Sequence, residues 1–350
     1  MRYRLDRHKK IIILITILQF FVTKFIFIRL YEKYYSDPEG TCQLDDILIS
    51  DQMPAPGQSI FFIETMYHPD VNDPVRRPKL GPRQACAIES AARHNPNFQV
   101  FIMFVGSTYR PTAGRDPLAE VVSSYANVHF RSLNIWSFAA GTPLESWLEK
   151  GDIFTSKYFF SHLSDFLRFL TLYRFGGIYL DMDAIVLRNL EHLPSNCVGA
   201  EDLGSINSAI IKIAATTTGH NIAKQFVYDL RENFNGSIWI NNGPGVVTRV
   251  TKKLCQTDQV PQMFLRPAPC SGIKVFRPDA FYPVHWSKWQ NFFDSDKLEE
   301  TMVAMKNSYV AHLWNNLSKN ETVTTTSKNA FRMIAEENCP RVYNKLGGVF

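Results

Sequence analysis

Apolar runs alternate with shorter polar or glycine-containing segments along most of the chain, and this pattern predicts strands and helices in turn. Residues 59–65, 98–105 and 128–133 have the β-branched and aromatic composition of short strands. Residues 85–94 predict a helix that ends at Asn95-Pro96. Strands that alternate with helices are typical of an α/β domain, in which helices cover the faces of a parallel sheet.

Residues 163–183 combine a helix, a glycine pair, a strand and two carboxylates. The apolar positions that recur at helical spacing, and so predict one buried face, are Leu163, Phe166, Leu167 and Leu170. Gly176 and Gly177 follow, where a helix end favours residues that tolerate positive φ. Residues 178–180 then predict a buried strand of a parallel sheet.

Asp181 and Asp183 end this strand, and Asp165 and Arg168 lie one helical turn apart before it. On an extended chain both carboxylates of the Asp-x-Asp should point to the same side, at the strand end where open α/β sheets bind ligands. Neighbouring carboxylates repel unless a cation lies between them, so the pair predicts a site for Mn²⁺ or Mg²⁺. A solvated turn and an exposed ion pair are the structural alternatives; the combination of the two pairs favours function.

This block, residues 164–190, resembles the nucleotide-sugar-binding core of the DXD glycosyltransferases. More closely, it resembles the family of α1,4-galactosyltransferases and α1,4-N-acetylglucosaminyltransferases. Other segments that resemble this family, in the family's order, are residues 82–93, 242–249, 281–283 and 312–314. The resemblance implies a GT-A-like, Rossmann-type mixed sheet flanked by helices.

The same resemblance implies a retaining transfer of a hexose or N-acetylhexosamine from a UDP-sugar, in α1,4 linkage, to a glycosphingolipid. UDP-galactose, UDP-N-acetylglucosamine and UDP-N-acetylgalactosamine all remain open as donors, because few pocket side chains distinguish them. A glycoprotein glycan also remains open as the acceptor.

The resemblance also assigns roles to individual residues. Asp183 is expected to bind the metal directly, with Asp181 and His312 completing the metal site and Asp181 also orienting the ribose or the sugar. Asn242 occupies a catalytic-site position at which related proteins have other residues; its amide could bind sugar hydroxyls but cannot act as a general base. The residues expected to bind the donor are Asp165, Arg168, Glu64, Thr65, Tyr179 and Trp314.

Two mechanisms are compatible with a retaining transfer. Double displacement needs a carboxylate nucleophile, for which Glu201 and Asp202 are sequence candidates, although both are also typical loop acids. A front-face substitution, in which a leaving phosphate oxygen accepts the acceptor's proton, needs no such residue, and we favour it.

Two other classes of protein fit the sequence less well. A Mg²⁺-dependent phosphohydrolase also uses Asp-x-Asp at a strand end, but no later Gly-Asp-x-x-x-Asp metal pair follows here. A non-catalytic, membrane-anchored lectin has no need for Asp165, Arg168, Asp181 and Asp183 together.

The N-terminal region predicts a type II membrane protein. Residues 1–10 are rich in arginine and lysine and predict a cytoplasmic tail, and residues 11–29 predict a signal-anchor span of near bilayer length. A cleaved signal peptide is the alternative, but no small-residue cleavage site follows the apolar run. Residues 30–58 predict a stem and residues 59–350 a lumenal catalytic domain, which the resemblance places in the Golgi.

A lumenal domain would face an oxidising, glycosylating compartment. The acceptors of the three glycosylation sequons are Asn235, Asn316 and Asn320. All six cysteines follow the predicted span and allow up to three disulfides, whose pairing the sequence leaves open. The net charge of +5 lies partly in the predicted tail, and the basic run at residues 76–79 predicts a solvated loop. We therefore expect no nucleic-acid partner.

Overall fold

The structure is a computed structural model that describes residues 44–65, 79–106, 116–346 and 349–350. Several features predicted from the sequence lie outside this part: the tail, the span, residues 30–43 of the stem with Cys42, and residues 76–78 of the basic run. Within the described ranges, no helix combines the length and the apolar character needed to cross a bilayer.

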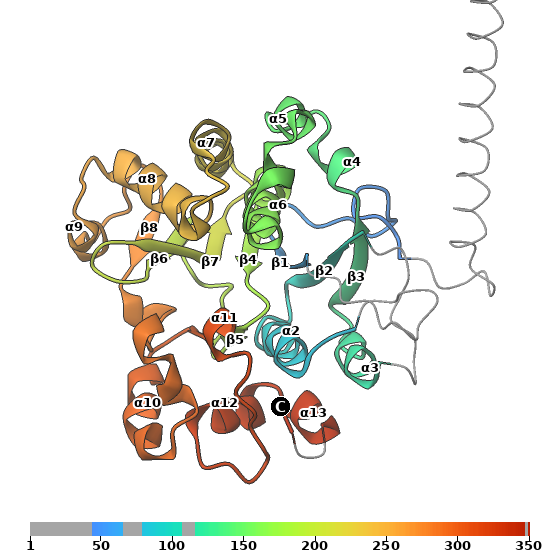
Figure 1. Cartoon of the computed structure of the whole chain (residues 1–350), viewed down its shortest axis with the longest axis vertical. Helices are drawn as coiled ribbons and strands as arrows, with labels where there is room; N and C mark the ends of the chain where they lie inside the picture. Colours follow the sequence, from blue (N-terminus) through green and yellow to red (C-terminus); the bar gives the residue numbers. More distant parts are fainter. Residues whose placement is uncertain (1–43, 66–78, 107–115, 347–348) are drawn as a thin grey trace, which may run out of the picture.

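A seven-stranded mixed sheet in the order β3-β2-β1-β4-β7-β6-β8 forms the centre of the molecule (Figure 1). Its strands are β1 (Ser59–Glu64), β2 (Gln99–Val105), β3 (Val128–Leu133), β4 (Gly177–Leu180), β6 (Cys197–Ala200), β7 (Ile206–Ile213) and β8 (Lys274–Phe276). The first four strands pair in parallel, whereas β7 is antiparallel to both β4 and β6. The sheet is therefore mixed, as the family resemblance implied, and not wholly parallel as the alternation of elements suggested.

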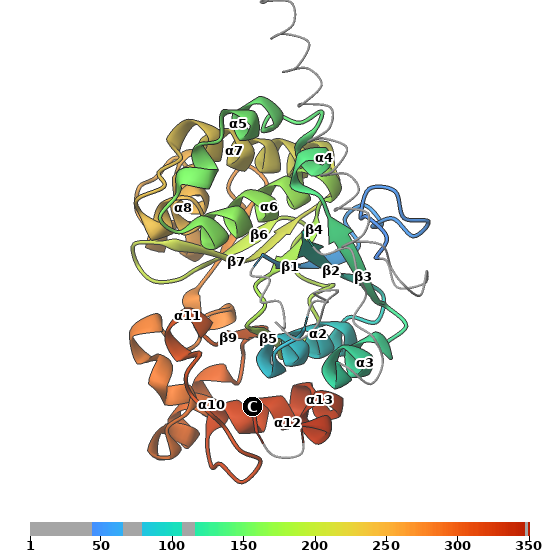
Figure 2. The same ribbon diagram turned by 45° about the vertical axis from the view of Figure 1, so that its right-hand side comes forward.

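Two layers of helices cover the sheet (Figures 1 and 2). On one face lie α4 (Ile135–Ala139), α5 (Glu145–Lys150), α6 (Phe159–Phe175), α7 (Thr217–Asn233) and α8 (Pro244–Cys255). On the other lie α2 (Pro82–His94) and α3 (Pro117–Ser123), and α12 (Ala330–Asn338) and α13 (Pro340–Lys345) pack against these helices. The shorter helical segments are α9 (Val260–Leu265), α10 (Leu298–Met305), α11 (Asn315–Ser318), η1 (Asp152–Thr155), η2 (Trp239–Asn241), η3 (Pro278–Ala280), η4 (Trp286–Phe292) and η5 (Ser295–Lys297).

Strand β1 shows how the sequence builds these layers. Successive side chains of a strand point to opposite faces. Ile60 and Phe62 accordingly pack with α2, while Phe61 and Ile63 pack with α6, and all four are buried. The predicted strands and the predicted helix are confirmed, the helix beginning three residues earlier, at Pro82.

The C-terminal region is joined to α2 in two ways. The disulfide Cys86–Cys339 links α2 to the end of α12. The fully buried carboxylate of Glu89 also accepts hydrogen bonds from the backbone N–H groups of Arg341 and Val342, at 3.0 and 2.7 Å. Elsewhere Cys255 pairs with Cys270, and Cys197 is buried and has no disulfide partner among the described residues.

Residues 44–58, which the sequence placed in the stem, pack on the domain. Ile47 is fully buried, and its N–H donates to the carbonyl of Ser132 in β3 at 3.0 Å. Gly57 donates in the same way to the carbonyl of Phe175 at the end of α6, at 2.9 Å. The folded part therefore includes these residues as well as the predicted catalytic domain.

Candidate metal and donor site

Helix α6 and the glycine pair after it position the candidate residues. The four apolar positions predicted to face the core are all buried, and so are Asp165 and Arg168, at 4% and 5% exposure. Gly176 ends the helix at φ +63°, with its N–H bonded to the carbonyl of Leu172 at 3.0 Å. The predicted helix is thus confirmed, but the prediction of a single buried face is wrong, because all residues from 165 to 172 are buried. The Asp/Arg pair therefore lies in the interior.

Gly177 lets β4 lie directly beside β1. Its φ is +90°, and a Cβ at this position would collide with the carbonyl oxygen of Ser59. Ile178 and Tyr179 can then pair in parallel with Ile60 and Phe61. The glycine pair therefore sets the position of the carboxylates that follow β4.

Asp181 and Asp183 lie on a turn, closed by the N–H of Ala184 bonding to the carbonyl of Asp181 at 3.0 Å. The expectation that they lie on an extended chain is wrong. Because β4 ends at Leu180, the chain folds back before β5 (Ala184–Val186) begins. Both carboxylates nevertheless point to one place, since each faces the ring of His312.

A two-stranded sheet brings His312 to this turn. β5 pairs antiparallel with β9 (Val310–His312), and the ladder sets Ala184 opposite His312. Two further bonds fasten the turn: Leu313 N–H donates to the carbonyl of Asp183 at 3.1 Å, and Asn315 N–H donates to Asp183 Oδ2 at 2.6 Å.

The resulting cluster of Asp181, Asp183 and His312, here called the metal cluster, has one ligand atom from each residue within 4.8 Å of the others. His312 Nε2 lies 3.2 Å from Asp183 Oδ1 and 3.8 Å from Asp181 Oδ2. Two carboxylates and one imidazole are a donor set that suits divalent ions such as Mn²⁺. His312 Nδ1 is buried without a hydrogen-bond partner among the described residues, so the ring is not fixed by a second-shell acceptor.

Arg168 joins the metal cluster to Asp165. Its Nη2 lies 3.1 Å from Asp181 Oδ1 and 3.4 Å from Asp165 Oδ1, while its Nη1 donates to the carbonyl and hydroxyl oxygens of Ser208, at 2.8 and 2.5 Å. The guanidinium also lies over the ring of Tyr179, at 4.6 Å from its centroid. Tyr179 in turn donates a hydrogen bond to Asp181 Oδ1 at 2.7 Å.

Burial and charge shift the pKa values of these groups in different directions. Burial raises the pKa of Asp165 to about 7, against the opposing effect of Arg168. Burial also acts to raise the pKa of Asp181, but Arg168 and His312 outweigh it and hold that pKa well below its usual range. Burial disfavours the charged form of His312, yet Asp183 and Asp181 together raise its pKa to about 10. The two carboxylates thus favour a positive charge at this position.

Trp314 and the end of β1 flank these groups. Trp314 is 8% exposed; its Nε1–H donates to the carbonyl of Val284 at 2.8 Å, and its ring meets His312 edge-on, 4.3 Å between centroids. The indole therefore packs against the His312 ring. Glu64 accepts a hydrogen bond from the amide of Gln84, and Thr65 donates to the carbonyl of Phe160 at 3.1 Å.

Asn242 is close to the site but its amide is turned away from it. The residue is fully buried; its Oδ1 accepts from the N–H of Asn235 at 2.9 Å, and its Nδ2 donates to the Asn235 carbonyl at 3.0 Å. The next residue, Gly243, packs against Asp165, where a Cβ would collide with the carboxylate. In this conformation both atoms of the Asn242 amide are bonded to Asn235 and hold the loop that carries Gly243.

The polar residues at the start of β7 were not predicted to belong to the site. Asn207 and Ser208 are buried at the point where β7 passes beside Asp181, whose N–H bonds to the carbonyl of Ala209 at 2.9 Å. Two adjacent polar residues near the start of a strand whose other residues, except Lys212, are aliphatic were the available signal. Glu201 accepts a hydrogen bond from Asn207 Nδ2 at 2.6 Å, and burial raises its pKa.

The other sequence candidates are spread over the surface. Asp202 stabilises its own loop by accepting from the N–H groups of Gly204 and Ser205, at 2.7 and 2.8 Å, as a loop acid does. The sequon residues Asn235, Asn316 and Asn320 are exposed.

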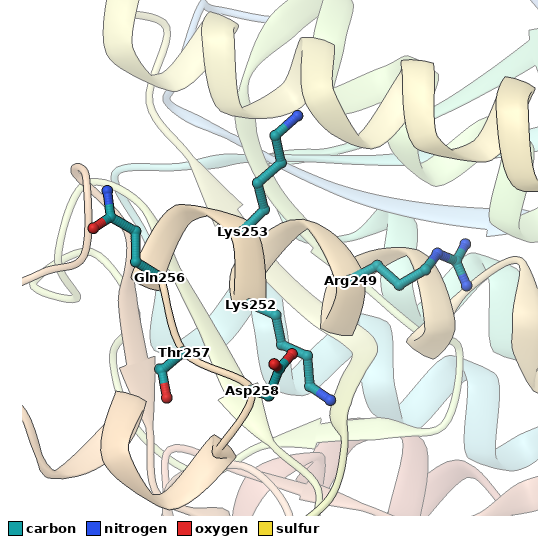
Figure 3. Close-up of a pocket in the computed structure, with 6 residues that line it drawn as sticks. All are labelled: Arg249, Lys252, Lys253, Gln256, Thr257 and Asp258. Carbon is teal, nitrogen blue, oxygen red and sulfur yellow. The ribbon is translucent and has the colours of Figure 1, made fainter.

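Figure 3 shows a surface cavity of about 450 Å³ along α8 and the segment after it, lined by Arg249, Lys252, Lys253, Gln256, Thr257 and Asp258. None of the residues of the metal cluster lines it. Arg249 is already paired with Asp229 at 2.7 Å, so this basic cavity is separate from the candidate site.

Comparisons with known proteins point to one family. Residues 215–346 match the alpha 1,4-glycosyltransferase conserved region, and residues 81–202 match the glycosyltransferase sugar-binding region containing the DXD motif. Lactosylceramide 4-alpha-galactosyltransferase of Mus musculus is 32% identical over 83% of this chain and 77% of its own length. Alpha-1,4-N-acetylglucosaminyltransferase of Homo sapiens is 27% identical over 75% of each chain. A solved galactosyltransferase, LgtC, in complex with donor and acceptor sugar analogs covers 82% of this chain and 95% of its own, with 13% identity and a TM-score of 0.38.

Proposed function

Because this chain belongs to the α1,4-glycosyltransferase family, we propose that it transfers a hexose or N-acetylhexosamine from a UDP-sugar, in α1,4 linkage with retention, to a glycosphingolipid. Galactose transfer to lactosylceramide is the reaction named for the mouse relative. Transfer of N-acetylglucosamine is the second candidate, because the human relative named for that sugar covers a similar share of the chain. The proposed location is the Golgi membrane, with type II topology.

The main support for this proposal is that Arg168 contacts both the metal cluster and Asp165. One guanidinium contacts both Asp165 and Asp181, so a group bound at the metal cluster and a group bound at Asp165 would share one side chain. A nucleotide-sugar has those two parts, a diphosphate and a sugar. A lectin or a phosphohydrolase gives no reason for this connection.

The residues of the metal cluster fit a resident divalent ion, for which we propose Mn²⁺ or Mg²⁺ held by Asp183, Asp181 and His312. When bound, such an ion offsets the negative charge of the diphosphate as UDP leaves. Tyr179 and Arg168 keep Asp181 Oδ1 occupied, and Asn315 N–H holds Asp183 Oδ2. Each aspartate therefore offers mainly its other oxygen to the ion.

The protein groups beside this cluster would orient the donor. Asp165 is placed to accept hydrogen bonds from sugar hydroxyls, and Arg168 to donate to a phosphate oxygen. Glu201 is buried and engaged with Asn207, so the structure gives no separate support for a nucleophile, and we retain the front-face route for the retaining step.

Isothermal titration of the full-length protein in detergent with UDP, with and without Mn²⁺, tests the proposal. Binding should need the metal, and removal of the metal by a chelator should abolish it. Metal-independent binding, or none in either condition, would refute the assignment. A panel of the three UDP-sugars against lactosylceramide and other glycosphingolipids would then identify the donor and the acceptor.

A further inference from the structure

We propose that an exposed apolar surface beside the donor site docks on the lipid bilayer that contains the acceptor. This inference rests on the proposed glycolipid acceptor. The surface, here called the apolar rim, consists of Trp136, Phe154, Phe160, Ile238, Trp239 and Ile240. These side chains are 50, 43, 49, 49, 42 and 58% exposed, respectively.

The apolar rim is built from three neighbouring segments of the chain, which the following contacts link to one another. Trp136 contacts Phe154 with 5.6 Å between ring centroids, and Phe154 contacts Phe159, the neighbour of Phe160, at 5.9 Å. Trp239 joins the same surface, since its Nε1–H donates to Ser161 Oγ at 2.8 Å. Contiguous exposed apolar side chains of this kind mark an interaction site more often than chance exposure does.

Hydrogen bonds hold the rim in a fixed shape. Lys157 N–H donates to the carbonyl of Gly236 at 2.9 Å, and Ser156 Oγ donates to the same carbonyl at 3.2 Å. His162 Nε2 lies 3.2 Å from the carbonyl of Trp239. The loop with Ile238, Trp239 and Ile240 is thus fastened to the start of α6 by polar contacts beneath it, with its apolar side chains left outward.

The rim borders the candidate site. α6 runs antiparallel to β4, so its first turn lies at the edge of the sheet where β4 ends and Asp181 follows. Phe160 precedes Asp165 on this helix by little more than one turn, and its carbonyl accepts the hydrogen bond of Thr65, at the end of β1. An acceptor that reaches Asp165 and the metal cluster would therefore pass beside the rim.

The position of the N-terminal chain argues that the occupant is a bilayer. Leu44 is the first residue that the structure describes, and its carbonyl accepts a hydrogen bond from the hydroxyl of Ser132 in β3. Ser132 lies four residues before Trp136 in the chain. The fourteen residues 30–43 between this point and the predicted span can extend over roughly 50 Å at most. The edge with Trp136 is thus where the chain that leads to the predicted span joins the folded part, and the linker holds this edge within roughly 50 Å of the span. Tryptophan and other aromatic side chains are favoured at the membrane–water interface.

Transfer to two acceptors with the same sugar head group tests the proposal. The full-length protein, reconstituted in vesicles, is assayed with lactosylceramide in the same bilayer and with free lactose in solution. The double variant Trp239→Ser and Ile240→Ser should lose about tenfold in transfer to lactosylceramide and little in transfer to lactose, because only the first reaction needs the bilayer contact. Val303→Ser, at a 67% exposed position on α10, is the matched control and should change neither.

A second measurement does not depend on catalysis. Brominated lipids in the vesicles should quench the fluorescence of the wild-type protein, and Trp239→Phe should remove part of that quenching. Because Asn235 lies three residues before Ile238, each protein is also prepared with Asn235→Gln, so that altered glycosylation is not mistaken for loss of the rim.

The results of these two measurements would support or overturn the bilayer contact as follows. Equal losses with both acceptors would mean that the rim supports the site itself, and unchanged activity with unchanged quenching would mean that it does not meet the bilayer. If the double variant lost transfer activity in cells but not in purified vesicles, the rim would be assigned to a protein partner. Each of these three results would overturn the proposal. Quenching by brominated lipids without transfer to either acceptor would support the bilayer contact while refuting the proposed reaction.

Discussion

At the scale of single residues, the two aspartates of the metal cluster are held differently. Asp181 Oδ1 is already bound by Arg168 and Tyr179, whereas Asp183 Oδ1 faces His312. We predict that Asp183→Asn lowers metal-dependent transfer by about a hundredfold, and by more than Asp181→Asn does, because it removes the more available metal ligand. Transfer rates over a Mn²⁺ titration measure this. Near wild-type transfer by Asp183→Asn in the presence of a chelator would contradict it.

Asp165 should distinguish a nucleotide from a nucleotide-sugar. Asp165→Ala removes a buried carboxylate that we place at the sugar, so binding of the UDP-sugar should weaken roughly ten- to a hundredfold. The affinity for UDP itself should hardly change. Titration of the variant with both ligands in Mn²⁺ measures the difference. Equal losses for both would place this carboxylate at the nucleotide instead.

The raised pKa of Asp165 also predicts how stability changes with pH. The pKa is about 7 in the folded protein and 3.8 in the unfolded one, so the folded state binds the proton more tightly. The free energy of unfolding should therefore fall as pH rises from about 4 to 7 and then level off.

Asp165→Asn should remove this contribution to the pH dependence, and at pH 8 its free energy of unfolding should exceed that of wild type by on the order of a few kcal/mol. Thermal unfolding of both proteins at pH 5 and pH 8 provides the measurement. A wild-type protein that gains stability from this carboxylate as the pH rises would contradict the assignment.

At the scale of elements, the joint between α6 and β4 depends on Gly177. An alanine there would meet the Ser59 carbonyl and would also hold an unfavourable positive φ. We predict that Gly177→Ala lowers the free energy of unfolding by about 3 kcal/mol or more. Gly141→Ala is the control, because Gly141 has φ +70° but no atom within 4 Å of the added Cβ. It should lose only about 1 kcal/mol, and equal losses would show that the contact with Ser59 has no effect.

The sequence was informative where a signal was local. Helical spacing, two glycines and an apolar triplet are adjacent in the chain, and so they predicted α6, the joint and β4. The turn at Asp181 was not predictable in this way, since its shape depends on β5 pairing with β9, and each of these strands has three residues. Ser208 and Asn207 belong to the site through the antiparallel pairing of β7 with β4, a long-range contact that no pattern within β7 specifies.

At the scale of the whole molecule, the apolar run at residues 11–29 predicts a cytoplasmic N-terminus and a lumenal catalytic domain. An N-terminal tag should be reachable only from the cytosolic side of intact membranes, and glycosidase treatment should increase the electrophoretic mobility of the full-length protein. Protease protection of the tag and gel mobility are the measurements. A protected tag, or a product shortened at its N-terminus, would favour the cleaved signal peptide instead.

The pairing of β5 with β9 has a consequence for biosynthesis. Ala184 and His312 are opposite one another in the ladder, although all of the polypeptide between them must be made before they can meet. A nascent chain that has just passed residue 183 has both aspartates but not yet the imidazole of His312. It also lacks the backbone N–H groups of Leu313 and Asn315 that fix the turn. The complete metal cluster can therefore form only after β9 has left the ribosome. A product of premature termination before that point would have the complete Asp-x-Asp motif but not the complete metal cluster.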